Sequence, residues 1–342
     1  MSARGVWIIG AGKRVLETAY PAFLRAPREC SVLGVFARNA RELTIVGQSV
    51  RVEDSAQMSA SRLRDVDLVY VAVGKAALPV VLGALSRFDL SRVDLLIDTP
   101  VLLPKQFRHV ARFAAFRNAW VAEDCIELPW YDTVARAREA GLLGALREAR
   151  FERSAYRYHA FAMVKAVFGA DRIERATRSR VGVDEIRTLE LGADRRAVVV
   201  EPRDYAVGSF ALRGERASVT DGDAVDGALR IVTSRSRDGR ADGFRIGDVA
   251  TQLDDDERAL LTMSAAARVT GNMEDWKRVG FLRLLRRIHA GSGAYPIEQG
   301  LDDSFLDFRL DKFGSARAGD WHDWRSKLGR SLWSVLSRAS RG

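Results

Sequence analysis

The chain has 342 residues, of which 47% are hydrophobic and 29% are charged. At roughly 100–200 residues per domain, this length predicts two domains, and the composition excludes collagen-like, disordered and disulfide-scaffold proteins. Two cysteines and four histidines do not support a disulfide framework or a structural metal site. No apolar run reaches the roughly 18 residues of a membrane span, and the first residues lack a signal-peptide layout, so we expect a cytoplasmic protein.

The formal net charge is +9, from 54 basic and 45 acidic residues. A basic protein can bind nucleic acid or an anionic surface. Here the basic excess is spread over both halves of the chain, without a helix-turn-helix, zinc-finger or RNA-recognition pattern. We therefore expect a small-molecule substrate rather than nucleic acid as the partner.

The first third of the sequence alternates apolar strands with helices. Helices are expected between the strands, and Pro21 requires a local break in the helix at 16–26. Continuous apolar strands separated by helices predict a doubly wound parallel sheet, the Rossmann arrangement. The strands are expected at 6–10, 31–37, 43–54, 66–74, 93–100 and 119–124.

The pattern changes after about residue 125. Short strands with polar turns over 180–250 predict an antiparallel sheet. The fold class is therefore α/β, with a dinucleotide-binding domain at 1–124, an α+β substrate domain at 125–314 and a C-terminal helix at 315–342. Further helices are expected at 130–149, 159–169, 254–270 and 274–290.

The C-terminal segment 315–342 is basic and amphipathic. It carries six Arg or Lys and two Asp residues. Such a helix most often packs on its own protein or a sister subunit, and contact with an anionic membrane surface is the alternative. Its apolar stripe consists of Trp321, Trp324, Leu328, Leu332 and Val335.

A glycine turn follows the first strand. Gly10 permits a tight turn, and Gly12 lets the backbone approach a pyrophosphate whose charge the following helix stabilises. Lys13 and Arg14 continue this turn, and Val15 stands where the fingerprint has its third glycine. The position between strand and helix favours dinucleotide binding, with an ordinary glycine-rich turn as the alternative.

The end of the second strand bears on the choice of cofactor. An acidic residue there would bind the ribose hydroxyl of NAD. The sequence instead has Arg38 and Asn39. Arg38 could hold a 2′-phosphate, which favours NADP over NAD, although it could also be a solvated arginine.

Four stretches together resemble a known family. In chain order they are GAGKRVLETAYPAF, VDLVYVAVG, LLIDTP and YRYHAFAMVKAVFG. They resemble, in the same order, the glycine turn, the fourth strand, the Glu-Lys-Pro motif and the Asp-x-x-x-His helix of the Gfo/Idh/MocA proteins. This is the glucose–fructose oxidoreductase and inositol dehydrogenase family. The resemblance covers nearly the whole chain. It implies a Rossmann domain followed by a large, open, mostly antiparallel sheet that often serves oligomerisation. It also implies NAD(P)-dependent oxidation or reduction of a sugar, sugar nucleotide or cyclitol.

The resemblance extends the expected cofactor site and shows departures from the family. Val73 and Gly74, together with Asp98-Thr99-Pro100 in the place of Glu-Lys-Pro, are expected beside the cofactor. Threonine cannot replace a titrating ammonium. His159 retains the place of the family's acid/base, but Ala155 replaces the aspartate that would orient it.

Two interpretations remain open. In the first, the site is rebuilt around Lys75, His159 and a carboxylate from Glu123 or Asp124, and Lys75, His159 and Asp124 are the expected catalytic residues. Tyr156 and Tyr158 could donate to a substrate oxygen or be core residues. The function is then an oxidoreductase, with NADPH favoured, for a polyol, sugar-derived or other small hydroxyl, carbonyl or imine substrate in biosynthesis, in a homo-oligomer. In the second, the chain is a cofactor-binding or scaffold protein, or a non-redox enzyme.

Overall fold

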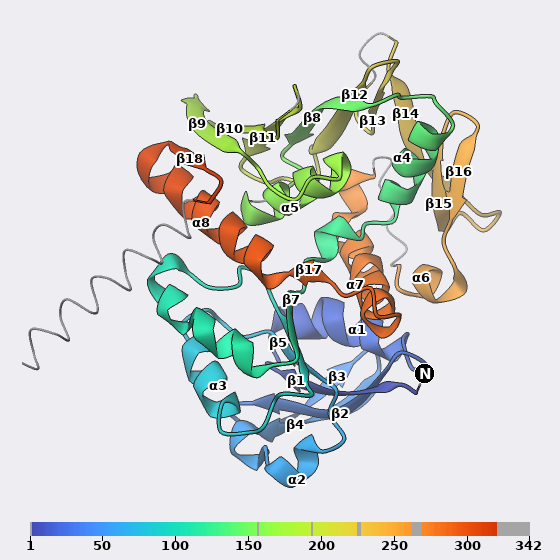
Figure 1. Cartoon of the computed structure of the whole chain (residues 1–342). Helices are drawn as coiled ribbons and strands as arrows, with labels where there is room; N and C mark the ends of the chain where they lie inside the picture. The colour runs from blue at the N-terminus through green and yellow to red at the C-terminus, as the bar shows by residue number, and fades with distance from the viewer. Residues whose placement is uncertain (1, 156, 193, 224–226, 262–268, 320–342) are drawn as a thin grey trace, which may run out of the picture.

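The computed structural model describes residues 2–155, 157–192, 194–223, 227–261 and 269–319. They form two β-sheets with helices packed between them (Figure 1). Sheet A has the strand order β17-β7-β6-β5-β1-β2-β4-β3, and sheet B the order β16-β15-β14-β13-β12-β8-β11-β10-β9-β18. The expected α/β fold with a second, mostly antiparallel sheet is confirmed.

Sheet A is parallel from β7 to β4, and its edge strands β17 and β3 are antiparallel to their neighbours. The strand expected at 43–54 is a hairpin, because Val46 and Gly47 have positive φ angles of 50° and 76° and reverse the chain. The strands are β1 (Arg4–Ile9), β2 (Cys30–Ala37), β3 (Arg41–Ile45), β4 (Gln48–Asp54), β5 (Leu68–Val71), β6 (Asp94–Ile97), β7 (Asn118–Val121) and β17 (Tyr295–Pro296).

The helical stretch after the glycine turn changes type where the sequence predicts a break. It begins as a π-helix, η1 (Val15–Ala19), and continues as α1 (Tyr20–Leu24), with Pro21 in the first turn of α1. Pro21 has no N–H to donate, and the wider π turn that precedes it accommodates this missing donor within a continuous helical stretch. The remaining helices of this half are η2 (Ser55–Gln57), α2 (Ala60–Leu63), α3 (Leu78–Leu85), η3 (Pro104–Ala115) and η4 (Asp124–Ile126).

Sheet B contains one strand that the sequence analysis assigned to a helix. The helix predicted at 130–149 is wrong in its second half. α4 (Trp130–Glu139) ends there because Gly141 and Gly144 adopt positive φ angles of 73° and 70°, and the chain then crosses the sheet as β8. The strands are β8 (Leu146–Glu152), β9 (Arg175–Val181), β10 (Asp184–Glu190), β11 (Arg196–Glu201), β12 (Ser209–Gly214), β13 (Ser218–Thr220), β14 (Leu229–Arg235), β15 (Ala241–Ile246), β16 (Val249–Gln252) and β18 (Ser315–Arg317).

Three helices lie between the two sheets: α5 (Arg157–Phe168), α7 (Met273–His289) and α8 (Ile297–Phe313) (Figure 1). Of the helix predicted at 254–270, the structure shows α6 (Asp255–Ala259), and residues 262–268 lie outside the described part; η5 (Thr270–Asn272) follows. The segment predicted as a C-terminal helix begins with β18 of sheet B, and residues 320–342 lie outside the described part.

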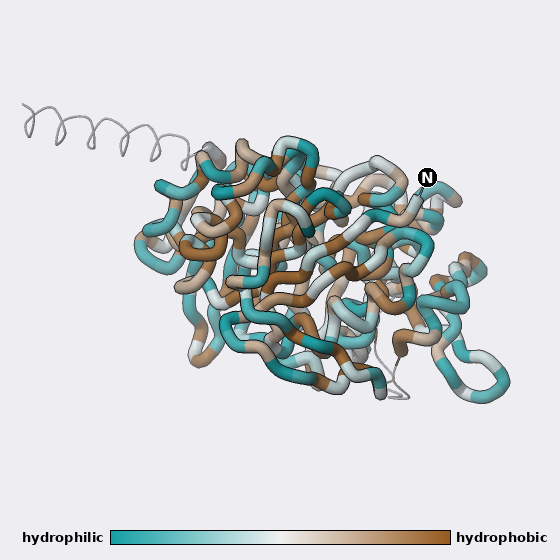
Figure 2. Tube along the Cα trace, turned by 90° about the horizontal axis from the view of Figure 1, so that it is seen from below, coloured by the Kyte–Doolittle hydropathy of each residue, from teal (hydrophilic) through white to brown (hydrophobic). Residues whose placement is uncertain are grey.

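The hydrophobic core joins the two halves of the chain. One apolar cluster runs from Val6 and Ile8 of β1 through Phe281 of α7 to Phe210 and Phe244 of sheet B. A second cluster fills the other face of sheet A against α3 and η3. Figure 2 shows hydrophobic segments in the interior and hydrophilic segments in the peripheral loops. Among the described helices, none is long and apolar enough to cross a membrane.

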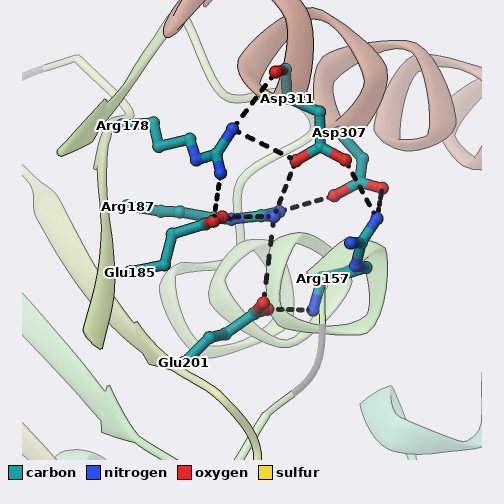
Figure 3. A network of polar contacts seen from close by, with 7 residues as sticks. All are labelled: Arg157, Arg178, Glu185, Arg187, Glu201, Asp307 and Asp311. Carbon is teal, nitrogen blue, oxygen red and sulfur yellow. Dashed lines mark hydrogen bonds and ion pairs between the residues drawn. The ribbon is translucent and has the colours of Figure 1, made fainter. Parts of the chain in front are cut away.

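A buried charge network fixes the start of α5 (Figure 3). Arg187 of β10 is fully buried, and its guanidinium donates to Asp307 at 2.5 Å and Glu185 at 2.8 Å. It also forms an ion pair with Glu201 at 3.8 Å. Glu201 Oε1 accepts the backbone N–H of Arg157 at 2.5 Å. The network therefore ties sheet B and α8 to the first residue of the helix that carries His159.

Candidate functional site

The glycine turn has the shape that close approach of a ligand requires. Gly10 has a φ angle of 119°, and a Cβ atom there would lie 2.0 Å from the carbonyl oxygen of Ala72. A Cβ atom on Gly12 would meet no atom within 4 Å, so its backbone faces open space. Val15 is fully buried and packs into the core. Two of the three fingerprint positions thus retain their geometry, and the turn fits a dinucleotide.

Arg14 joins the ends of two strands. Its Nε donates to Asp98 Oδ1 at 3.1 Å, after β6, and its Nη1 donates to Asp124 Oδ2 at 2.7 Å, after β7. Burial alone would raise the pKa of Asp124, but the positive charges of Arg14 and Lys277, with the hydrogen bond from Arg14, outweigh burial and hold that pKa below its usual value. Nη2 of Arg14 is buried and has no hydrogen-bond partner among the described residues. Asp124 is therefore an ion-pair partner of Arg14 in this structure.

Glu123, rather than Asp124, is the carboxylate that orients His159. His159 Nδ1 lies 2.8 Å from Oε1 and 2.9 Å from Oε2 of Glu123, which is 2% exposed. Because a carboxylate only accepts hydrogen bonds, Nδ1 carries a proton and Nε2 is the atom left to exchange one. Nε2 lies 3.4 Å from Thr99 Oγ1. Glu123, the residue before η4, thus supplies the carboxylate that Ala155, before α5, cannot supply.

His159 faces a cavity of about 350 Å³. The cavity lies where the glycine turn, the ends of β6 and β7, the start of α5 and the helix α7 meet. Tyr158 also lines it, with its ring centre 4.6 Å from that of His159. The other lining residues are Lys13, Arg14, Glu17, Thr18, Asp98, Thr99, Asp124, Arg203, Glu274 and Lys277.

Lys75 lies next to this site without lining the cavity. Its Nζ donates to the backbone carbonyl of Asp98 at 2.7 Å, directly before Thr99. Burial lowers the pKa of Lys75 to about 8, partly opposed by the charge of Asp98. The Nζ of Lys75 thus contacts the residue that precedes Thr99, and Thr99 stands where the family motif has its lysine. Its catalytic role stays a prediction.

The other predicted cofactor residues lie around the glycine turn. Lys13 is exposed, 3.6 Å from Glu17. Arg38 and Asn39 are exposed after β2, Gly74 is exposed after β5 beside the partly buried Val73, and the Thr99–Pro100 peptide is cis. Tyr156 lies outside the described residues.

Three residues at the candidate site escaped the sequence analysis. Arg41 donates to the carbonyl of Ala11 at 2.9 Å and so lies against the glycine turn. Lys277 and Arg203 line the cavity from α7 and from the segment after β11. The sequence did contain one signal for Arg41, because it lies three residues after Arg38, which was already a candidate for cofactor binding. No local signal in the sequence pointed to Lys277 or Arg203.

The folded chain also brings together potential metal ligands that are distant in sequence. The ligand atoms of Glu123, Cys125 and His159 lie within 4.8 Å of one another. Burial raises the pKa of the Cys125 thiol well above its ordinary value, and both Glu123 oxygens already contact His159 Nδ1. The arrangement is therefore better described as a histidine–carboxylate pair beside a neutral thiol.

Comparison with known proteins supports the fold. No protein-family model matches the sequence, and no curated protein matches it. An oxidoreductase from Agrobacterium radiobacter, solved with NAD+, L-tartaric acid and magnesium, is 12% identical with a TM-score of 0.62 and covers 94% of this chain and 100% of its own. A putative myo-inositol dehydrogenase from Sinorhizobium meliloti is 11% identical with a TM-score of 0.61, covering 92% and 99%.

A third similar structure is the scyllo-inositol dehydrogenase from Lactobacillus casei with bound NAD(H) and scyllo-inositol. It is 11% identical, has a TM-score of 0.58, and covers 92% of this chain and 99% of its own. At such identities the likeness shows a shared fold. The architecture implied by the resemblance to Gfo/Idh/MocA proteins is thus confirmed along most of the chain.

Proposed function

We propose that this chain is an oxidoreductase that uses a nicotinamide nucleotide, with NADPH favoured, on a polyol, sugar-derived or other small hydroxyl, carbonyl or imine substrate. The observation that carries the proposal is the Glu123–His159 pair, which lines up an acid/base in a cavity bounded by the glycine turn. Structures of this fold that bind NAD(H) with scyllo-inositol, or NAD+ with L-tartaric acid, support the same reaction class.

The residues have separable tasks in this reaction. The turn at Gly10 and Gly12 would hold the pyrophosphate, and a nicotinamide nucleotide, when bound, supplies the carbon that accepts or gives hydride. Glu123 keeps the Nδ1 proton and orients the ring. His159 Nε2 takes the hydroxyl proton during oxidation and returns it during reduction. Thr99, 3.4 Å from Nε2, can hydrogen-bond to the same oxygen but does not titrate.

The preference for NADPH is supported by the charges at the end of β2. Arg38 is exposed there, and Arg41 contacts the turn through the carbonyl of Ala11. Two guanidinium groups near the expected ribose suit a 2′-phosphate, whereas the segment 36–39 offers no carboxylate for a ribose hydroxyl.

One observation favours the alternative of a catalytically inactive cofactor-binding protein. Thr99 stands in the place of the lysine of the Glu-Lys-Pro motif. Lys75, the nearest lysine that could replace it, donates a hydrogen bond to the Asp98 carbonyl. The two functions differ in one measurable property, since an inactive member would bind the nucleotide and transfer no hydride.

Calorimetric titration with NADPH and NADH, followed by turnover assays, tests the proposal. We expect NADPH to bind more tightly and at least one polyol, carbonyl or imine from a panel to be turned over by the wild-type chain. His159→Asn should keep nucleotide affinity and lose turnover. Binding without any turnover would support the inactive alternative, and no binding of either nucleotide would refute the cofactor assignment.

Homo-oligomerisation remains part of the proposal. The face of sheet B around β8 and β11 carries exposed ion pairs such as Arg196 with Glu148 at 2.8 Å and Arg213 with Glu148 at 3.7 Å. An interface there would be polar. Light scattering of the purified chain tests this, with a monomer at all concentrations as the contrary result.

A further inference from the structure

The wall of the cavity formed by α7 and the segment after β11 has no task in the proposed reaction. It carries Lys277 and Arg203, two basic side chains that line the same cavity as His159. They come from positions 74 residues apart in the sequence, so no local motif explains their meeting. A pair of cations at a ligand cavity is a recognition device for an acidic group.

Of these two residues, Lys277 is the stronger evidence for a ligand site because it is buried. It is only 7% exposed, and it forms no ion pair with a carboxylate among the residues that the structure describes. Burial disfavours its charge, but neighbouring groups, including Cys125, Tyr205, Asp124 and Glu274, outweigh burial and raise the pKa of Lys277 above its ordinary value. The cavity wall therefore holds a desolvated ammonium group.

The acidic residues of the cavity act on Lys277 through space, but none of those that the structure describes forms an ion pair with it. Asp98 and Asp124 are both bound to Arg14, and Glu17 lies 3.6 Å from Lys13. Glu274 is exposed to solvent, where screening weakens its attraction. A ligand anion in the cavity would therefore meet Lys277 without having to displace a carboxylate from an ion pair.

Tyr205 brings the two cations together. Nζ of Lys277 lies 5.4 Å from the centre of its ring, and the guanidinium carbon of Arg203 lies 4.9 Å from the same centre. The ring attracts both cations through its electron-rich face and limits their freedom. Such pre-ordering reduces the entropy lost when a ligand binds.

We propose that Lys277 and Arg203 bind an acidic group of the substrate, a carboxylate or a phosphate, while His159 acts on a hydroxyl group of the same molecule. This inference rests on the proposed function for the role of His159 alone. The substrate class is then a hydroxylated acid or a sugar phosphate rather than a neutral polyol. A cavity of about 350 Å³ lies in the range of small-molecule sites.

Matched ligand pairs test the inference by calorimetry, in the presence and absence of NADPH. D-glucuronate is compared with D-glucose, and glycerol 3-phosphate with glycerol. We expect at least one acid to bind about tenfold or more tightly than its neutral counterpart, because charge-assisted hydrogen bonds are roughly twice as strong as neutral ones. Which pair shows the preference identifies carboxylate or phosphate as the recognised group.

Substitutions in the cavity wall test which residues cause the preference for the acid over its neutral counterpart. Lys277→Met and Arg203→Met should each bring the ratio of acid to neutral affinity close to one, and Lys277→Arg should retain it. Lys105→Met, which removes an exposed lysine outside the cavity, is the control and should behave as the wild type. Arg203 is itself exposed, so its variant remains informative where the buried Lys277→Met substitution fails to fold.

Three results would overturn the inference. Equal affinity for both members of each pair, or no binding of either acid at millimolar concentration, would show that the wall does not recognise an anion. An unchanged ratio in the Met variants would place recognition elsewhere. Loss of NADPH affinity in Lys277→Met with an unchanged ratio would assign the lysine to the cofactor. Failure of the proposed function is seen separately, as absence of NADPH binding while acid binding is still measurable.

Discussion

The cavity beside the glycine turn and the network around Arg187 are both clusters of buried charge, yet they are built differently. In the network, the guanidinium of Arg187 faces Asp307, Glu185 and Glu201, so that every charge has an opposite one close by. In the cavity, only Nδ1 of His159 faces a carboxylate, and Lys277 forms no ion pair with a carboxylate among the described residues. Charges that are paired with opposite charges hold structural elements together, whereas charged side chains that face a cavity are available to a ligand.

The largest expected effect is on catalysis at His159. His159→Ala should lower kcat by about 10²–10⁴-fold, because it removes the proton-exchanging atom. Glu123→Gln should lower kcat less and alter its pH profile, because the His159 ring keeps a hydrogen-bond partner but loses the negative charge beside Nδ1. Steady-state kinetics with the best substrate of the panel measures both. Similar activity of His159→Ala and wild type would remove His159 from the mechanism.

Arg187→Met should have the largest effect on stability. It leaves Asp307, Glu185 and Glu201 without their buried countercharge, and we expect a loss of roughly 3–5 kcal/mol in the free energy of unfolding. Urea titration measures this loss. NADPH affinity below the unfolding range should stay unchanged, because Arg187 does not line the cavity. A loss below about 1 kcal/mol would mean that the network contributes no more than surface ion pairs.

Lys75 should show its lowered pKa in its reactivity. With a pKa of about 8, it should carbamoylate with cyanate at pH 7 on the order of 10- to 100-fold faster than an ordinary lysine, as followed by peptide mass spectrometry. The unfolded chain, with a lysine pKa of about 10.4, binds this proton more tightly. The contribution of Lys75 to the free energy of unfolding therefore increases as the pH rises from about 8 to about 10.4. A reaction rate that reaches half its maximum only above about pH 10 would contradict the shift.

Arg38→Ala should produce the smallest of these effects. Loss of a charge-assisted bond to a 2′-phosphate should weaken NADPH binding by about tenfold and leave NADH binding nearly unchanged. Arg41→Ala is the companion variant, since Arg41 contacts the turn itself and should affect both nucleotides. Equal weakening of both nucleotides by Arg38→Ala would discard its proposed specificity role.

The sequence predicted those features that depend on local pattern. Apolar runs and the glycines at Gly10 and Gly12 were enough to place most strands of sheet A and the turn, because burial and backbone geometry act within a few residues. β8 was missed because the helical pattern of 130–149 continues past Gly141 and Gly144, and only the fold shows that these glycines adopt positive φ. β17 has two residues, too short for any periodicity.

The candidate site was only partly predictable for a related reason. His159 could be named because its segment resembles the histidine-bearing helix of the family. Its carboxylate partner comes from another element, and the choice between Glu123 and Asp124 depends on which of them Arg14 engages. Lys277 lies in a correctly predicted helix. Its inward orientation depends on how α7 packs against the turn region, and that information is tertiary.

The edge strand β17 has a consequence for how this protein forms during synthesis. Sheet A is bounded on one side by Tyr295–Pro296 pairing with β7, and α7 covers part of its face. A ribosome must therefore translate past residue 296 before sheet A can close its edge. Until then the nascent N-terminal half exposes an unpaired strand and an uncovered apolar surface, both of which chaperones recognise and which favour aggregation.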